Sequence, residues 1–140
     1  MEISTDRDRL DRDLIHRFLS EDSYWAKGRE RGVTEAAIDG SLCFGAYADD
    51  GTQLGFARVV TDRATFGFLA DVFVVAEARG AGVGKAIIAA VMAHPDVRRL
   101  GRLALATKDA HGLYGQYGFI PLDETELWMI CRPRETWQAT

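Results

Sequence analysis

The spacing of apolar residues along the chain changes near residue 41. Before that point, apolar side chains recur at helical spacing in a charged background, at Leu10, Leu14 and Phe18. This spacing predicts an amphipathic helix over about residues 8–19. A shorter helix is predicted over about residues 34–39, ended by Gly40, and the segment between the two helices is predicted to be a loop.

Three apolar runs follow, and turn residues separate them. The runs cover about residues 42–47, 54–60 and 65–75, and they are rich in β-branched and aromatic side chains. Asp50-Gly51 and Asp62-Arg63 are typical turn sequences. Three strands joined by tight turns predict an antiparallel meander.

The second half of the chain predicts a crossover. A glycine-rich loop at residues 79–84 precedes a helix that His94-Pro95 ends, and an apolar strand at about residues 103–106 follows. The two strands of such a unit are parallel. The remaining predicted elements are a helix over about residues 110–117 and strands over about 119–121 and 127–131. The fold class is therefore α/β (α+β), with a mixed, mostly antiparallel sheet flanked by helices in a single domain, 1–140.

Composition narrows the classes of function. The 140 residues carry a net charge of −4, which argues against a general nucleic-acid binder. The N-terminus lacks the apolar core of a signal peptide, and no apolar run approaches the ~18 residues of a membrane span. Cys43 and Cys131 are interpreted as buried free thiols in a reducing compartment, and one disulfide between them is the alternative. We therefore expect a cytoplasmic protein with no nucleic-acid or membrane partner.

Basic residues gather in one segment of this acidic chain. Residues 76–102 hold five basic and two acidic side chains, and they include the glycine-rich loop. An anionic ligand is expected there. If part of the remaining acidic surface faces an acceptor site, the acceptor is a cationic amine; the alternative is that these acids are solvated helix faces.

The glycine-rich loop does not match two common phosphate-binding motifs. Glycines before a helix let the backbone approach a phosphate, and free N–H groups at the helix N-terminus attract it. Arg79 and Ala86 stand where the nucleotide-triphosphate loop needs glycine and a hydroxyl, and the dinucleotide fingerprint lacks its last glycine. The pattern that does match is Arg-x-x-Gly-x-Gly, at Arg79, Gly82 and Gly84.

This pattern resembles motif A of the GNAT superfamily of acyl-CoA-dependent N-acetyltransferases. Residues 110–119, with Tyr114 and Gly118-Phe119, resemble motif B of the same family. The resemblance covers about residues 42–131 and implies the GNAT acyl-CoA N-acyltransferase fold, whose first strand residues 1–4 are expected to supply. It also implies acetyl-CoA (coenzyme A) as co-substrate, and we expect no metal because no ligand cluster is apparent.

The resemblance implies a set of cofactor contacts. In the family, the strand before the loop pairs with pantetheine and the loop binds the pyrophosphate. The residues assigned to acetyl-CoA in this way are Val72, Phe73, Val74, Arg79, Gly80, Ala81, Gly82, Val83, Gly84, Lys85 and Thr107. Thr107 departs from the asparagine of many members, and its hydroxyl offers fewer donors to a pantetheine amide.

Acetyl transfer needs a neutral amine and a proton for the departing thiolate. Tyr114 occupies the family's position for the general acid, and packing is its alternative role. Asp71 lies within an apolar strand, where burial is expected to raise its pKa toward that of a useful base. The alternative for Asp71 is a structural partner for a hydroxyl, an arginine or a loop amide. His111 is a second candidate base, with a surface position at a helix start as its alternative.

The segment between the first two helices is the candidate acceptor site. Tyr24, Trp25 and Arg29 lie where the family builds one wall of that site, and a hydrophobic plug is their alternative role. We predict an acetyl-CoA-dependent N-acetyltransferase that acts on the primary amine of a small molecule by direct attack in a ternary complex. The alternatives are a protein or peptide N-acetyltransferase and a non-catalytic acyl-CoA-binding module. Because the family often forms dimers, a homodimer through residues 127–131 is also expected.

Overall fold

A five-stranded sheet forms the centre of the computed structural model, which describes residues 1–134. The strands, in their order across the sheet, are β1 (Glu2–Ser4), β2 (Leu42–Tyr47), β3 (Gln53–Thr61), β4 (Phe66–Val74) and β5 (Arg102–Ala104). The first four are antiparallel neighbours, whereas β4 and β5 run parallel. This confirms the predicted mixed sheet and the expectation that the N-terminal residues add its first strand.

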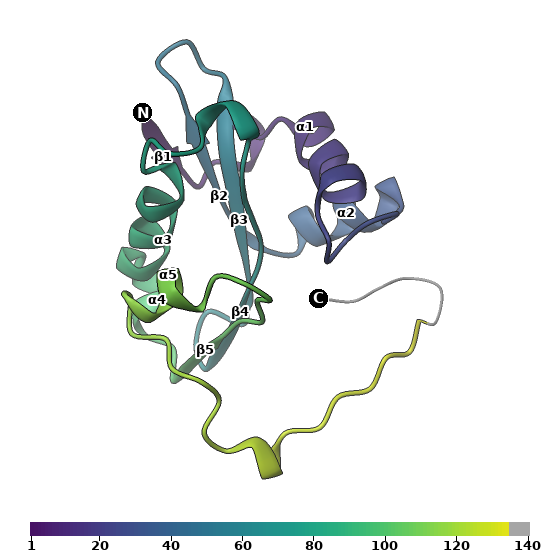
Figure 1. Ribbon diagram of the computed structural model, residues 1–140, viewed down its shortest axis with the longest axis vertical. Coiled ribbons are helices and arrows are strands. Elements are labelled where there is room, and N and C mark those ends of the chain that lie inside the picture. The colour runs from purple at the N-terminus through teal and green to yellow at the C-terminus, as the bar shows by residue number, and fades with distance from the viewer. Residues whose placement is uncertain (135–140) are drawn as a thin grey trace.

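Helices cover both faces of the sheet (Figure 1). One face carries α1 (Arg12–Arg17), a π-helical turn (Phe18–Asp22) and α2 (Arg31–Asp39). The other carries α3 (Val83–Ala93), α4 (Pro95–Arg98) and α5 (His111–Gly115). Short 3-10 turns cover Arg7–Arg9, Ala76–Ala78 and Thr125–Leu127. The helix α3 makes the predicted crossover from β4 to β5 and ends at His94, as expected.

Two clusters of buried apolar side chains hold the layers together. Ile87, Ile88 and Val91 of α3 pack in one cluster with side chains of the central strands. The second cluster lies beneath α1 and α2, where Phe18 stacks on Phe73 with ring centroids 4.1 Å apart. Because successive side chains of a strand point to opposite faces, the central strands contribute to both clusters.

The first helix predicted over residues 8–19 is right from Arg12 onward and wrong as one continuous helix, because an aspartate begins a new turn within it. The Asp6 carboxylate accepts a hydrogen bond from the N–H of Asp8, and the Asp11 carboxylate accepts one from the N–H of Leu14. Each aspartate therefore caps a new turn. Leu10 between them has an extended backbone, so the chain forms a 3-10 turn and then α1.

The strands predicted over residues 119–121 and 127–131 are also wrong. The structure has a 3-10 turn over Thr125–Leu127, and within residues 1–134 no strand follows β5. A strand needs a neighbour for its backbone hydrogen bonds, and Figure 1 shows this segment running away from the sheet. Apolar side chains in it, such as Leu127, Met129 and Ile130, are exposed.

The structure also bears on the predicted thiols and membrane segments. Cys43 is free and buried, whereas Cys131 is free and exposed, so the expectation of two buried thiols is right only for Cys43. Among residues 1–134, no helix has the length and apolar character that crossing a membrane requires.

Candidate active site

β4 and β5 separate partway along the sheet. They are paired from Phe66 opposite Arg102 to Phe68 opposite Ala104, where β5 ends. β4 continues to Val74, and within the described residues no strand lies beside residues 69–74 on that edge. Backbone N–H and C=O groups along such an edge are available to a ligand that extends the sheet.

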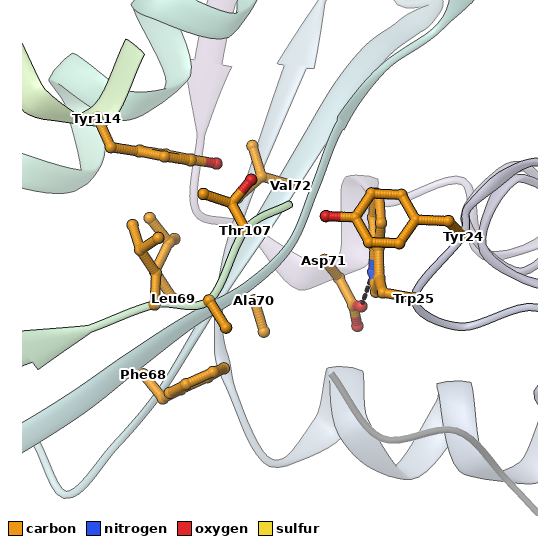
Figure 2. Close-up of a pocket in the computed structure, with 11 residues that line it drawn as sticks. Tyr24, Trp25, Phe68, Leu69, Ala70, Asp71, Val72, Thr107 and Tyr114 are labelled. Atoms are coloured by element: carbon orange, nitrogen blue, oxygen red, sulfur yellow. Dashed lines mark hydrogen bonds between the residues drawn. The ribbon is translucent and has the colours of Figure 1, made fainter. Parts of the chain in front are cut away.

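A cleft opens where the two strands separate (Figure 2). Tyr24 and Trp25 line it from the loop before α2, residues 68–72 from β4, residues 105–107 from the segment after β5, and Tyr114 from α5. It contains about 400 Å³ of space, part of which is open to solvent. A concave site with apolar walls and a few convergent polar groups is typical of small-molecule binding.

A bulge in β4 shapes the floor of the cleft. Phe73 lies opposite Phe56 and Ala70 lies opposite Arg58, so two residues of β4, Asp71 and Val72, face the single residue between them on β3. Asp71 adopts φ +55°, which aspartate tolerates better than most side chains. The bulge turns the Asp71 carboxylate toward the loop before α2, as Figure 2 shows.

The Asp71 carboxylate accepts three hydrogen bonds. Arg29 Nη1 and Arg58 Nε donate to Oδ2 at 2.8 Å and 2.7 Å, and Trp25 Nε1 donates to Oδ1 at 2.8 Å. The side chains of Asp71 and Arg29 are only 1% exposed. Burial by itself raises the pKa of Asp71, but the two arginines outweigh burial and hold that pKa below its ordinary value.

The expectation of a raised pKa for Asp71 is therefore wrong. Sequence reasoning saw the apolar neighbours of Asp71 on β4 but not the arginines from the loop before α2 and from β3. An ionised carboxylate held by two guanidinium groups is a weak base, so we do not propose Asp71 as the general base. Its geometry matches the alternative role, a structural partner for arginine.

Tyr114 is buried on the other side of the cleft. Its side chain packs edge-on against Phe119, with ring centroids 5.7 Å apart, and its hydroxyl points into the cleft (Figure 2). Burial, and then the nearby Tyr24 and Asp109, raise the pKa of Tyr114. The phenol is therefore protonated throughout the neutral range, as a proton donor must be.

The glycine-rich loop lies between the end of β4 and the N-terminus of α3. Gly80 and Gly82 have φ of +84° and +80°, and a Cβ on either would meet no atom within 4 Å. The open side of the loop leaves room for a ligand to approach its backbone. The first hydrogen bond of α3 runs from the N–H of Ala86 to the Gly82 carbonyl. The N–H groups of the first turn that have no helical acceptor are those of Val83, Gly84 and Lys85.

The other residues assigned to acetyl-CoA lie along the same strand and at the cleft rim. Val72 lines the cleft, whereas the Phe73 side chain is buried on the opposite face, so a contact with the ligand would use its backbone. Arg79 Nε donates to the Val74 carbonyl at 3.3 Å. Thr107 lines the cleft, and its hydroxyl accepts a hydrogen bond at 3.2 Å from the N–H that precedes α5.

The structure separates the three residues predicted to form the acceptor wall. Tyr24 and Trp25 line the cleft, as expected for such a wall. Arg29 does not, because it lies buried behind Asp71, and its expected direct contact with a substrate is wrong in this geometry. The sequence shows where Arg29 lies along the loop, but it does not show which side chains of that loop become buried against the sheet.

Two residues at the site escaped sequence reasoning. Arg58 holds Asp71 from the neighbouring strand β3, and the antiparallel pairing of the two predicted strands could have indicated this contact. Lys108 donates its backbone N–H to the Tyr24 hydroxyl at 2.8 Å, a contact that no local pattern predicts. His111, the second candidate base, is exposed at the first residue of α5, which matches its alternative surface position.

Comparisons with known proteins identify the class to which this fold and site belong. Residues 39–121 match the profile of the acetyltransferase (GNAT) domain. A Gibberella zeae protein with an inferred acetyltransferase activity is 30% identical over 136 residues, which cover 81% of this chain and 75% of that protein. The chain therefore belongs to the GNAT acetyltransferase family.

Solved structures agree with this assignment. A Xanthomonas campestris pv. campestris protein of the GNAT family, also with an inferred acetyltransferase activity, has a TM-score of 0.91 and 52% identity, covering 94% of this chain and 92% of its own. The fold is also shared with Rv2747 from Mycobacterium tuberculosis, solved in complex with CoA, at a TM-score of 0.70 and 16% identity. That alignment covers 88% of this chain and 74% of Rv2747.

Members of this family use acetyl-CoA, and the chain has features that suit it. The open edge of β4 can pair with an extended pantetheine arm. The open loop at Gly80 and Gly82, followed by the free N–H groups of α3, can hold a pyrophosphate. The open strand edge and the open loop follow one another along the chain, from β4 to the N-terminus of α3.

Proposed function

We propose that the protein transfers the acetyl group of acetyl-CoA to the primary amine of a small molecule, by direct attack in a ternary complex. The observation that carries the proposal is the arrangement of three features along β4: its open edge, the inward-pointing hydroxyl of Tyr114 at the cleft beside that edge, and the open glycine-rich loop that follows the strand. Together they would hold a thioester between a strand edge and a proton donor.

The residues that would hold acetyl-CoA are those along β4 and the loop. Backbone groups of residues 69–74 would bind pantetheine, and the first turn of α3, with Arg79 and Lys85 beside it, would bind the pyrophosphate. Acetyl-CoA supplies an activated acetyl thioester when it is bound. Thr107 at the rim keeps its own hydroxyl proton for donation, because its recorded hydrogen bond uses the oxygen as acceptor.

Tyr114 would supply the proton that the departing sulfur needs. Its raised pKa keeps that proton on the hydroxyl at neutral pH, and only a group that holds a proton can donate one. The acceptor amine would lose one proton to solvent, to which part of the cleft is open, before it attacks the thioester carbonyl. A second proton, released from its nitrogen as the C–S bond breaks, would restore the Tyr114 hydroxyl. The ionised Asp71 does not need to take that proton in this mechanism.

A panel of acceptors tests the proposed function. Acetyl-CoA would be mixed with small amines, polyamines, amino acids and lysine peptides, and the release of free coenzyme A thiol would be followed together with the mass of the acetylated product. We expect matched amounts of thiol and N-acetylated small amine. Binding of acetyl-CoA without turnover of any acceptor would show a non-catalytic binding module, and turnover of peptides alone would show a peptide acetyltransferase.

The proposal includes a homodimer. Within the C-terminal segment, Leu127, Met129 and Ile130 are 70%, 96% and 68% exposed. Side chains of this size are rarely left uncovered together on a monomer, and extended segments of this kind can add to the sheet of another chain. A second copy of this chain is the partner that we propose for them.

The proposal also places the protein in the cytoplasm and makes its activity independent of metal. Burial raises the pKa of the Cys43 thiol to about 11, so this thiol stays protonated in the reducing compartment that two free cysteines favour. Every proton transfer described above uses Tyr114 or solvent. We expect EDTA to leave the rate of coenzyme A release unchanged, and a rate restored only by added metal would contradict this expectation.

A further inference from the structure

Tyr24 crosses the mouth of the cleft. Its backbone belongs to the loop before α2, yet its hydroxyl accepts a hydrogen bond at 2.8 Å from the N–H of Lys108, in the loop between β5 and α5. Lys108 Nζ also lies 5.5 Å from the centre of the Tyr24 ring. These two loops stand on opposite sides of the opening between β4 and the segment after β5, so the Tyr24 side chain joins its two rims.

The other end of this bridge is fixed to β4. Trp25 meets Tyr24 edge-to-face, with ring centroids 5.0 Å apart, and Trp25 Nε1 donates to Asp71 at 2.8 Å. Asp71 is in turn held by Arg29 and Arg58. A continuous set of contacts therefore runs from the bulge of β4 through Trp25 and Tyr24 to the loop before α5. This gives the buried aspartate a positioning role for the aromatic pair.

The bridge faces the proton donor across the cleft. Figure 2 shows the hydroxyls of Tyr24 and Tyr114 directed toward each other from opposite sides, with Thr107 between them. Tyr24 also contributes to the raised pKa of Tyr114. The Tyr24 side chain is part of the outer surface, at 45% exposed, so an acceptor amine that enters from the side of the loop before α2 would pass it on the way to Tyr114.

We propose that Tyr24 is a specificity-determining residue that limits the acceptor to a compact, chain-terminal primary amine. A slender amine can enter beside the bridge from one side. A lysine within a polypeptide carries chain in two directions, and that chain would collide with a ring tied to both rims. The inference deepens the proposed function and depends on it.

The test compares acceptor selectivity among variants. Hexylamine and a nonapeptide with one central lysine would be assayed with the wild type, Tyr24→Ala and Tyr24→Phe. Removing the ring should raise the ratio of kcat/KM for the peptide to that for hexylamine by at least about 10-fold, the scale on which pocket shape discriminates between substrates. Tyr24→Phe keeps the ring and loses the hydrogen bond, so a smaller rise in the same ratio is expected.

Lys108→Ala is the matched control. It removes the ammonium group above the ring but keeps the backbone N–H that binds the Tyr24 hydroxyl, so the selectivity ratio should stay within about 2-fold of the wild type. Acetyl-CoA affinity, measured by titration, should be unchanged in all three variants, because none of these side chains belongs to the loop or to the edge of β4.

The outcomes separate the inference from the function on which it rests. If the wild type acetylates no amine, the proposed function fails. If the wild type acetylates hexylamine, and Tyr24→Ala leaves the selectivity ratio within about 2-fold of the wild type while still binding acetyl-CoA, the proposed function stands and the role of Tyr24 is overturned. If Tyr24→Ala does not fold, an unchanged ratio in Tyr24→Phe overturns that role equally.

Discussion

At the residue scale, Tyr114 and Asp71 lie at the same cleft with their pKa values shifted in opposite directions. Both are buried, which disfavours the charged form of each. Two arginines outweigh that effect at Asp71, whereas no cation is among the causes of the shift at Tyr114. Burial therefore keeps Tyr114 a protonated donor, whereas the two arginines keep Asp71 an anion in spite of burial.

Tyr114→Phe should lower kcat and leave acetyl-CoA affinity nearly unchanged. The change removes only the hydroxyl, so the packing on Phe119 survives. General acid catalysis is typically worth ~10²–10⁴-fold, and a thiolate is a fair leaving group, so we expect a loss of roughly 10- to 10⁴-fold. Because the pKa of Tyr114 is raised, the wild-type rate should fall only at pH above about 10, and the variant should lose that decline. A wild-type kcat in the variant would return Tyr114 to a packing role.

Asp71→Asn should destabilise the fold strongly. Removing the charge leaves Arg29 and Arg58 without their shared carboxylate, and breaking a buried ion pair in this way costs about 3–5 kcal/mol. The check is the free energy of unfolding at neutral pH from urea denaturation. A loss below about 1 kcal/mol would show that the buried cluster contributes little.

The same substitution predicts a pH dependence. The pKa of Asp71 is lower in the folded state than its ordinary ~3.9, so the ionised carboxylate stabilises the fold above that pH. This contribution is lost as pH falls below about 4, toward the folded-state pKa. The urea midpoint of the wild type should therefore fall more between pH 5 and pH 3, roughly, than that of Asp71→Asn. Parallel curves for the two proteins would contradict the lowered pKa.

At the scale of elements, the close approach of α3 to the sheet depends on a glycine in β3. A Cβ at Gly55 would lie 2.8 Å from Ile87 Cδ1 and 2.9 Å from the Phe73 carbonyl oxygen. A side chain can rotate away, but the carbonyl belongs to the neighbouring strand and cannot move without disturbing β4. The close packing of α3 and of β4 against β3 therefore depends on the absence of a side chain at Gly55.

Gly55→Ala should accordingly reduce the free energy of unfolding by about 1–3 kcal/mol, the usual cost of overpacking. Gly112→Ala is the matched control, because a Cβ there meets nothing within 4 Å and alanine favours the helix α5. Thermal unfolding of both variants measures the difference. Equal melting temperatures would contradict the close packing of α3 on β3.

The sequence predicts the helices, strands and loops better than it predicts the side-chain contacts that join them. The meander, the crossover and the glycine-rich loop follow from periodicity and turn chemistry, which are local. The capping role of Asp11 was available in the sequence but was not weighed against apolar spacing. The hydrogen bond of Tyr24 to Lys108 joins residues 84 positions apart along the chain, so no local pattern reveals it. The pairing of Arg58 with Asp71 joins neighbouring strands of one hairpin, but its detail depends on the bulge in β4.

At the scale of the whole molecule, the C-terminal segment is the part whose exposed apolar residues indicate a partner. If a second copy covers them, the wild type should elute as a dimer whose mass light scattering reports. Met129→Glu places a charge on a side chain that is 96% exposed, so it should leave the melting temperature of the monomer unchanged and shift the equilibrium to monomer. A monomeric wild type at all concentrations would contradict the proposed homodimer.

The central claim is that acetyl-CoA lies along β4 with its pyrophosphate on the glycine-rich loop. Gly82→Val and Gly51→Val form a matched pair, because both glycines have positive φ, of +80° and +90°, and both have open space around a Cβ. Each variant therefore carries similar backbone strain, but only Gly82 lies at the N-terminus of α3. Isothermal titration of acetyl-CoA should show at least a roughly 10-fold loss of affinity for Gly82→Val and wild-type affinity for Gly51→Val. Wild-type affinity in both variants would contradict the claim.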